Sequence, residues 1–277
     1  MIPIKDNIPT DRFPVVTVLL IVANFVVYLL AIRHGGSFIS GPAGHEVLKY
    51  GAIPDALSHA ASHPNQFWHP STVHCAQVVR TLNPGNPEVL CNSRELAANG
   101  IPAENSLPVW QTLFSSMFMH GSILHIGGNM LFLWIFGNNV EDSMGPVKFI
   151  FFYLLGGIAA LALQTAIDTS STAPTVGASG AIAAVLGGYI LIYPRARVLT
   201  LVFIILFFTV LELPAIVMLG IWFAEQAVFG AVGLTNPTGG GGGVAYFAHV
   251  GGFLFGLATI KLLATKVKPT SPRFPVY

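Results

Sequence analysis

Charged residues are scarce in this sequence. Lysine, arginine, aspartate and glutamate together make up 9% of the 277 residues, whereas soluble domains carry about 25%. Hydrophobic residues make up 53%, and the mean hydropathy is +0.68. This composition excludes an ordinary soluble domain and predicts an integral membrane protein that lies in a lipid bilayer.

An excess of either charge sign is also lacking, because the formal net charge is only +1. Nucleic-acid binding needs a strongly basic stripe, so we expect no nucleic-acid partner. The first residues, MIPIKDNIPTDRFP, lack the basic-then-apolar pattern of a cleaved signal. We therefore expect the apolar run that follows Pro14 to be a retained helix.

Cysteine is limited to Cys75 and Cys91. Both fall in a long polar segment that we expect to face an oxidising compartment, which permits a disulfide between them; two free thiols are the alternative. The cysteines and histidines lack the spacing of metal ligands, and the glycine run at 239–243 lacks the lysine of a phosphate loop. We expect no metal and no cofactor.

Apolar runs long enough to cross a bilayer predict six transmembrane helices. Their ranges are 15–32, 113–137, 149–167, 179–193, 214–232 and 245–265. The run at 198–211 is short for a span, and we interpret it as an interfacial or re-entrant lead-in to the fifth. With six spans and both termini inside, the short cytoplasmic segments contain most of the lysines and arginines. This distribution follows the positive-inside rule.

The predicted fold is an all-α polytopic membrane protein. Residues 1–14 form a cytoplasmic N-terminus, and residues 266–277 form a cytoplasmic tail. The membrane domain covers 15–265 and includes a large, partly folded external loop at 34–110.

Polar side chains interrupt the second predicted span, HGSILHIGGNM. His125 and Asn129 are four residues apart, so their side chains share one helix face. Both can donate hydrogen bonds to one point, as a site that stabilises a developing oxyanion requires. The alternative is a pair of polar groups that joins neighbouring helices.

The last span carries His249 near its predicted outer end, within YFAHVGGFLFG. Gly252 and Gly256 lie on the same helix face as His249 and allow close approach of another helix. The alternative for His249 is a buried histidine bonded to a backbone carbonyl.

Ser179 opens the fourth span within GASG, where Gly177 and Gly180 permit a sharp turn and close approach of the helix of His249. Alone, a serine here is also a common packing residue or helix cap. Ser179 and His249 nevertheless both begin inward-running helices on the external side, and a histidine in hydrogen-bond reach makes serine a nucleophile. Because no carboxylate adjoins either residue in sequence, we expect a Ser–His dyad whose histidine is oriented by packing.

These motifs together resemble the rhomboid family of intramembrane serine proteases. The matching segments are HGSILHIGGN, GASG and AHVGGFLFG, in the family's order and spans; FGNNVEDSMG at 136–145 is similar to the family's turn after the second span. The resemblance implies that Ser179 is the nucleophile and His249 the general base and acid. It implies an oxyanion hole of His125, Asn129 and the Ser179 N–H, and structural roles for His120 and Glu141.

The resemblance also implies an endopeptidase that cleaves single-span membrane proteins near or within the bilayer. It implies a multi-pass protein of the bacterial plasma membrane with both termini cytoplasmic. Ala183 departs from the pattern, because bacterial members often place there an aromatic ring that stacks on the histidine. The fifth segment keeps a similar character at Pro214, Ala215, Trp222 and Gln226, and the resemblance implies that this segment is the gate for substrate entry.

Two other functions are compatible with the sequence. A catalytically silent rhomboid-like binder would retain membrane clients without cutting them, although silent relatives usually lose the serine or histidine. A small transporter would use the histidines as a proton relay, but the sequence lacks broken helices in repeated halves.

Overall fold

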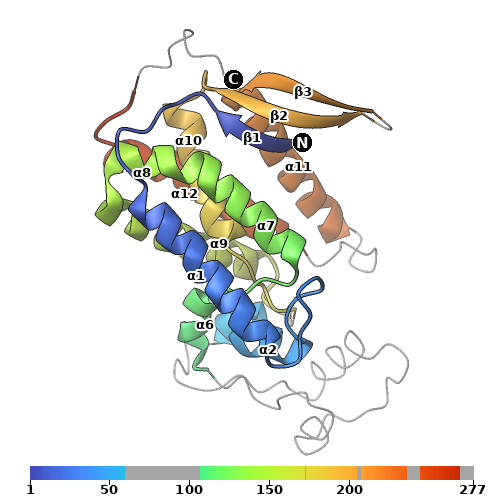
Figure 1. The fold of residues 1–277 in the computed structure, drawn as a ribbon. Coiled ribbons are helices and arrows are strands. Elements are labelled where there is room, and N and C mark those ends of the chain that lie inside the picture. The colour runs from blue at the N-terminus through green and yellow to red at the C-terminus, as the bar shows by residue number, and fades with distance from the viewer. Residues whose placement is uncertain (60–106, 172, 205–206, 236–243, 269–277) are drawn as a thin grey trace, which may run out of the picture. The chain divides into compact units, whose positions relative to one another are not determined.

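The computed structural model describes residues 1–59, 107–171, 173–204, 207–235 and 244–268 (Figure 1). The chain divides into two compact units. The first unit contains Met1–Ala23, Gly127–Leu163 and Ser179–Tyr277, and the second contains Asn24–Ile126 and Gln164–Ala178.

Among the residues that the structure describes, four helices are long and apolar enough to cross a membrane. They are α1 (Val15–Ile32), α9 (Pro146–Ile167), α11 (Ala215–Thr235) and α12 (Tyr246–Leu263). They correspond to the first, third, fifth and sixth predicted spans. Helix α11 is the least buried, with 22% of its apolar stretch buried against 28% to 33% in the other three.

The fourth predicted span corresponds to α10 (Ser179–Ile192), which is apolar but shorter than these four helices. The second, predicted over 113–137, is not one uninterrupted helix. Helix α6 (Val109–Ser115) ends early, and α7 (Ile123–Phe132) continues through the π-helical turn η1 (Leu133–Gly137) into α8 (Asn138–Met144). The break occurs where Ser122 Oγ accepts the His125 N–H at 3.1 Å, so a polar cap restarts the helix.

Three strands within the described part of the chain correct the all-α prediction. They are β1 (Ile2–Asp6), β2 (Arg197–Ile204) and β3 (Phe207–Pro214), and they form an antiparallel sheet in that order. The run at 198–211 is thus a hairpin, and it lies outside α11, which begins at Ala215. Its β-branched and aromatic residues fit a pleated strand, and periodicity alone cannot separate a short apolar strand from a short helix.

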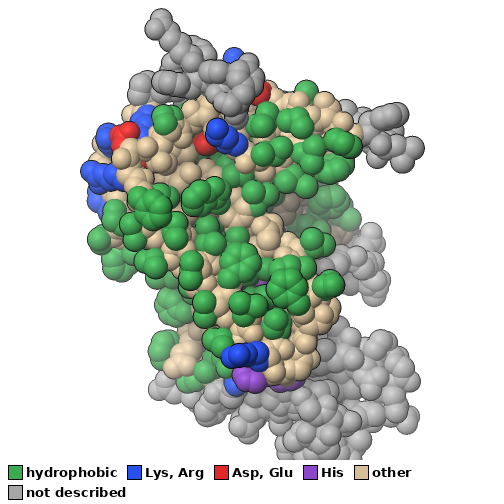
Figure 2. Space-filling view, in the orientation of Figure 1, with side chains coloured by type: hydrophobic (Ala, Val, Ile, Leu, Met, Phe, Trp, Pro, Cys, Tyr) green, Lys and Arg blue, Asp and Glu red, His purple; other side chains and the backbone are tan. Residues whose placement is uncertain are grey.

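Exposed hydrophobic side chains occur on several helices, and Figure 2 shows such side chains over much of the visible surface. On α1 and α9 they include Leu19, Val22, Val26, Leu29, Phe151 and Leu155. Water-soluble proteins rarely expose so much contiguous apolar surface, whereas lipid covers it at no cost. The exposed surface therefore agrees with a protein that lies in a bilayer.

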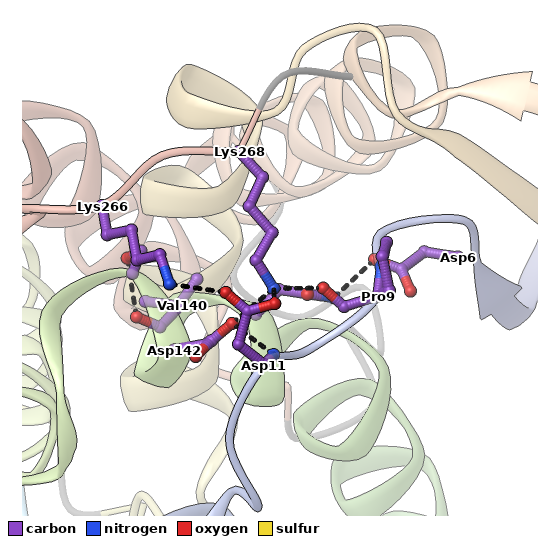
Figure 3. Close-up of polar contacts among 9 residues, drawn as sticks. Asp6, Pro9, Asp11, Val140, Asp142, Lys266 and Lys268 are labelled. Carbon is purple, nitrogen blue, oxygen red and sulfur yellow. Dashed lines mark hydrogen bonds and ion pairs between the residues drawn. The ribbon is translucent and has the colours of Figure 1, made fainter. Parts of the chain in front are cut away.

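A polar cluster in the first unit joins the segment before α1 to the segment after α12 (Figure 3). Lys266 Nζ lies 2.6 Å from Asp11 Oδ2, and Lys268 Nζ lies 3.0 Å from Asp11 Oδ1. Lys268 also contacts Asp142 Oδ2 of α8 at 2.7 Å and donates to the Pro9 carbonyl. Burial opposes the charge of Lys268, but the hydrogen bonds to Asp142 and Asp11 outweigh it and raise the Lys268 pKa.

Asp6 of β1 is buried in the same unit against α8 and α10. Its Oδ2 accepts hydrogen bonds from Asn139 Nδ2, at 2.7 Å, and from the Tyr189 hydroxyl. Burial raises the pKa of Asp6 to about 7, and the Tyr189 hydrogen bond and neighbouring Lys5 offset only part of this effect.

We expect this carboxyl to make stability fall as pH rises. Between pH 3.8, its ordinary pKa, and about 7, folded Asp6 keeps a proton that the unfolded chain has released. The stabilisation is therefore present in acid and lost through pH 7, by about 2–3 kcal/mol between pH 5 and pH 8. Unfolding measured at both pH values should show this loss in the wild type. Asp6→Asn, whose amide oxygen still accepts, should lack it; equal pH dependence in both proteins would contradict the assignment.

The second unit contains the described parts of the predicted external loop. Helices α2 (Gly44–Tyr50) and α3 (Pro54–His59) follow α1, and Ile53 and Ala56 pack with Val109 of α6 in a small core. A β-bridge joins Ala52 to Thr175. Cys75 and Cys91 lie outside the described residues, so their pairing stays a prediction.

Candidate active site

Ser179 is the first residue of α10, and its side chain is half-buried. Gly177, two residues earlier, has φ +119°, a backbone conformation that favours glycine. As the first helical residue, Ser179 carries a backbone N–H that has no partner within its own helix. The turn therefore places a hydroxyl and a backbone donor at the same point.

His249 of α12 meets Ser179 inside the first unit. The His249 Nε2 lies 2.8 Å from Ser179 Oγ, which is hydrogen-bond distance. The histidine is half-buried, in the first turn of α12. The two residues that the sequence analysis paired are thus brought together by the starts of two neighbouring helices.

Glycines bring α10 and α12 into backbone contact. A Cβ added at Gly252 would lie 2.0 Å from the Gly180 carbonyl oxygen, and one added at Gly256 would lie 2.0 Å from that of Ala184. Gly180 itself faces another helix, because its Cβ would lie 2.6 Å from Ala160 Cβ of α9. The close approach of α12, which carries His249, to α10 therefore depends on Gly252 and Gly256. The missing side chain of Gly180 instead allows α9 to pack closely against α10.

Helix α11 supplies two further contacts to His249. Gln226 Oε1 lies 2.8 Å from His249 Nδ1, and the Trp222 ring lies 5.8 Å from the imidazole between centroids. The expectation that packing alone orients the histidine is therefore incomplete. The sequence signal was the i, i+4 spacing of Trp222 and Gln226, which places both side chains on one face of α11.

His120 belongs to the second unit and is fully buried. Its Nδ1 lies 3.2 Å from the Phe118 carbonyl, and its Nε2 accepts the Ala178 N–H at 3.4 Å. Nearby, the Gly177 N–H donates to the Ser116 carbonyl at 2.8 Å. These bonds hold the residues that immediately precede Ser179.

His125 and Asn129 lie on one face of α7. The His125 Nδ1 accepts the Gly121 N–H at 3.4 Å, so the neutral ring carries its proton on Nε2. Asn129 is 9% exposed, and its Nδ2 has no hydrogen-bond partner within the part of the chain that is described. His125 Nε2–H and Asn129 Nδ2–H are therefore two donors on the same helix face.

The sequence around these residues matches a known protein family. The Rhomboid domain family model matches residues 108–266, more than half of the chain. The chain is a member of the rhomboid family. The matched range includes all the candidate site residues: His120, His125, Asn129, Gly177, Ser179, Gly180, Trp222, Gln226, His249, Gly252 and Gly256.

Three rhomboid relatives illustrate the range of the family. The yeast (Saccharomyces cerevisiae) Rhomboid protein 1, mitochondrial, is 30% identical over 53% of this chain and 40% of its own length. The mouse (Mus musculus) Presenilin-associated rhomboid-like protein, mitochondrial, is 28% identical over 70% of this chain and 50% of its own length. Rhomboid protease GluP of Bacillus subtilis is 37% identical over 35% of this chain and 19% of its own length.

This rhomboid chain thus spans half or less of the length of these relatives. Of the three names, that of the Bacillus protein states a protease activity. The yeast and mouse names specify mitochondria. The comparisons therefore support a membrane protein without favouring a bacterial plasma membrane.

Proposed function

We propose that this protein is a serine endopeptidase that cleaves membrane proteins by a Ser179–His249 dyad. The observation that carries the proposal is the 2.8 Å distance between Ser179 Oγ and His249 Nε2. A serine hydroxyl is a weak nucleophile until a base accepts its proton, and a neutral histidine at this distance is such a base.

The proposed reaction follows from this pair. Ser179 Oγ bonds to the carbonyl carbon of the scissile peptide while its proton passes to His249 Nε2. The tetrahedral oxyanion collapses, the C–N bond breaks, and His249 gives the proton to the departing amine. Water then attacks the acyl ester, with His249 accepting its proton and returning it to Ser179 Oγ.

The oxyanion donors in this proposal are the Ser179 N–H, His125 Nε2–H and Asn129 Nδ2–H. Support for Asn129 comes from its buried Nδ2, which lacks a partner within the described residues. Leaving a buried donor unpaired costs about 1–3 kcal/mol, and a bound oxyanion would supply the missing acceptor. His125 stands on the same helix face, and its Nδ1 contact leaves Nε2 protonated.

The proposed substrates are single-span membrane proteins. Rhomboid proteases act on membrane proteins in the bilayer, and Ser179 opens an apolar helix of a chain whose described residues include four bilayer-length helices. We further propose six membrane crossings, with α10 and the α7–η1–α8 run completing the set. Both termini then lie on the same, cytoplasmic side, consistent with the joined segments around Asp11 and Lys268.

Labelling with a fluorophosphonate probe in lipid vesicles tests the proposal. The wild type should label and cleave a single-span reporter, whereas Ser179→Ala and His249→Ala should do neither. Ser170→Ala, which changes an exposed serine, is the matched control and should behave as the wild type. Equal labelling of the wild type and Ser179→Ala would refute the assigned nucleophile. If the wild type and all the variants bound the reporter but none of them cleaved it, the result would favour the silent binder.

A further inference from the structure

Gln226 reaches His249 from the side opposite the serine. The imidazole lies between two hydrogen-bond partners, with Gln226 Oε1 2.8 Å from Nδ1 and Ser179 Oγ 2.8 Å from Nε2. Each partner comes from a different helix, α11 and α10, and both helices belong to the first unit. The arrangement has the form of a triad in which an amide occupies the third position.

The proton positions follow from the chemistry of these atoms. An amide oxygen can only accept, so the hydrogen bond at Nδ1 requires a proton on Nδ1. A neutral imidazole carries one proton, which leaves a lone pair on Nε2. That lone pair faces the Ser179 hydroxyl, so the ring is in the tautomer that can take the serine proton.

We propose that Gln226 is a positioning residue that holds His249 in the tautomer and orientation of a general base. The inference rests on the proposed function, because it assigns to Gln226 the task of aiming the base at Ser179. In this proposal Gln226 acts through His249, which it contacts at Nδ1.

Trp222 completes the support for the ring from the same helix. Its indole lies 5.8 Å from the imidazole between centroids, with 37° between the planes, and it also packs near Phe253 of α12 at 6.2 Å. Ala183, where bacterial family members often carry a stacking aromatic, is fully buried and too small for that task. In this chain the hydrogen bond to His249 Nδ1 and the Trp222 ring contact therefore both come from α11.

An amide suits this position better than a carboxylate within a bilayer. A carboxylate on Nδ1–H would stabilise the imidazolium form and would add a charge at membrane depth, where ionised groups are costly. Gln226 is neutral at every pH and still fixes Nδ1–H. It thus orients the base without changing the charge of the site.

Three variants separate this role from simple packing. Gln226→Leu keeps the side-chain volume but removes the acceptor, and we expect kcat to fall about 100-fold with KM within about twofold. Gln226→Glu restores an acceptor and should recover most of kcat, with the acidic limb of the pH–rate profile moved to higher pH. Glu225→Gln, at an exposed neighbour, is the matched control and should equal the wild type.

A second readout does not depend on cleavage. In ¹⁵N-histidine-labelled protein, the His249 signal is identified as the one missing from His249→Asn. We expect Nδ1–H in the wild type and in Gln226→Glu, and a shift towards Nε2–H in Gln226→Leu. The inference would be overturned if His249 carried its proton on Nε2 in the wild type. It would also be overturned if His249 had the same tautomer in the wild type and in both Gln226 variants. If the tautomers behave as expected but the probe never labels Ser179, Gln226 sets the tautomer of His249 while the proposed protease activity, and with it the general-base role, fails.

Discussion

Replacing Gly252 with alanine is expected to lower the rate of the proposed cleavage about 100-fold, because a displacement near 1 Å at a reacting pair costs about that much. The new Cβ would meet the Gly180 carbonyl oxygen at 2.0 Å, and neither backbone can yield within its helix. Helices α10 and α12 must therefore separate, which moves His249 away from Ser179. Overpacking of this kind also costs about 1–3 kcal/mol of unfolding free energy.

Gly220→Ala is the matched control for this change. Gly220 lies in α11, and its added Cβ would meet no atom within 4 Å among the described residues. Alanine there should leave cleavage unchanged and raise stability slightly, since alanine favours a helix by about 1 kcal/mol. Cleavage rates and unfolding in lipid measure both effects. If Gly252→Ala cleaves within twofold of the wild type, the backbone contact does not set the Ser179–His249 geometry.

Removing the Glu141 side chain is expected to destabilise the first unit by about 3 kcal/mol, because buried donors lose a charged acceptor. Glu141 of α8 is buried, and its carboxylate accepts the Val16 N–H at 3.0 Å and the Thr17 N–H at 2.8 Å. The Thr17 hydroxyl donates to it as well, at 2.8 Å. These donors lie in the first turn of α1, where backbone N–H groups lack helical partners and favour a negative charge.

Two further variants provide reference values for this loss of unfolding free energy. Thr17→Val removes one of the three hydrogen bonds and should cost about 1 kcal/mol. Glu225→Ala, on the exposed surface of α11, should leave unfolding nearly unchanged. Unfolding free energies in lipid or mild detergent provide the comparison. A Glu141→Ala variant no less stable than Thr17→Val would show that the carboxylate does not cap α1.

The sequence predicted most of the helical framework, because long apolar runs have few alternatives in a bilayer. The first span, 15–32, and α1 have the same bounds, and the glycine spacing after His249 correctly indicated a helix-contact face. The hairpin at 197–214 was missed because its strands form a nearly continuous apolar run, in which alternation cannot identify a strand. The break between α6 and α7 near Gly121 was missed because the hydropathy of a long window hides a single polar residue that caps a helix, here Ser122.

The candidate site was predictable where motifs carry a strong local signal. Ser179, His249, His125 and Asn129 stand out as polar groups inside apolar runs. Gln226 could not be assigned in the same way, because its relation to His249 depends on how α11 faces α12. A sequence gives the face of a helix that a residue occupies, but the angle between two helices comes only from their packing.

The weak burial of α11 has a consequence for where this protein would be active. The two α11 residues that contact His249, Gln226 and Trp222, belong to the least buried of the four candidate spans found among the described residues. Because protein covers little of α11, we expect the thickness and packing of the surrounding lipid to influence the position of these two side chains. Turnover should then vary with acyl-chain length and with the detergent used for extraction, even where the fold remains intact.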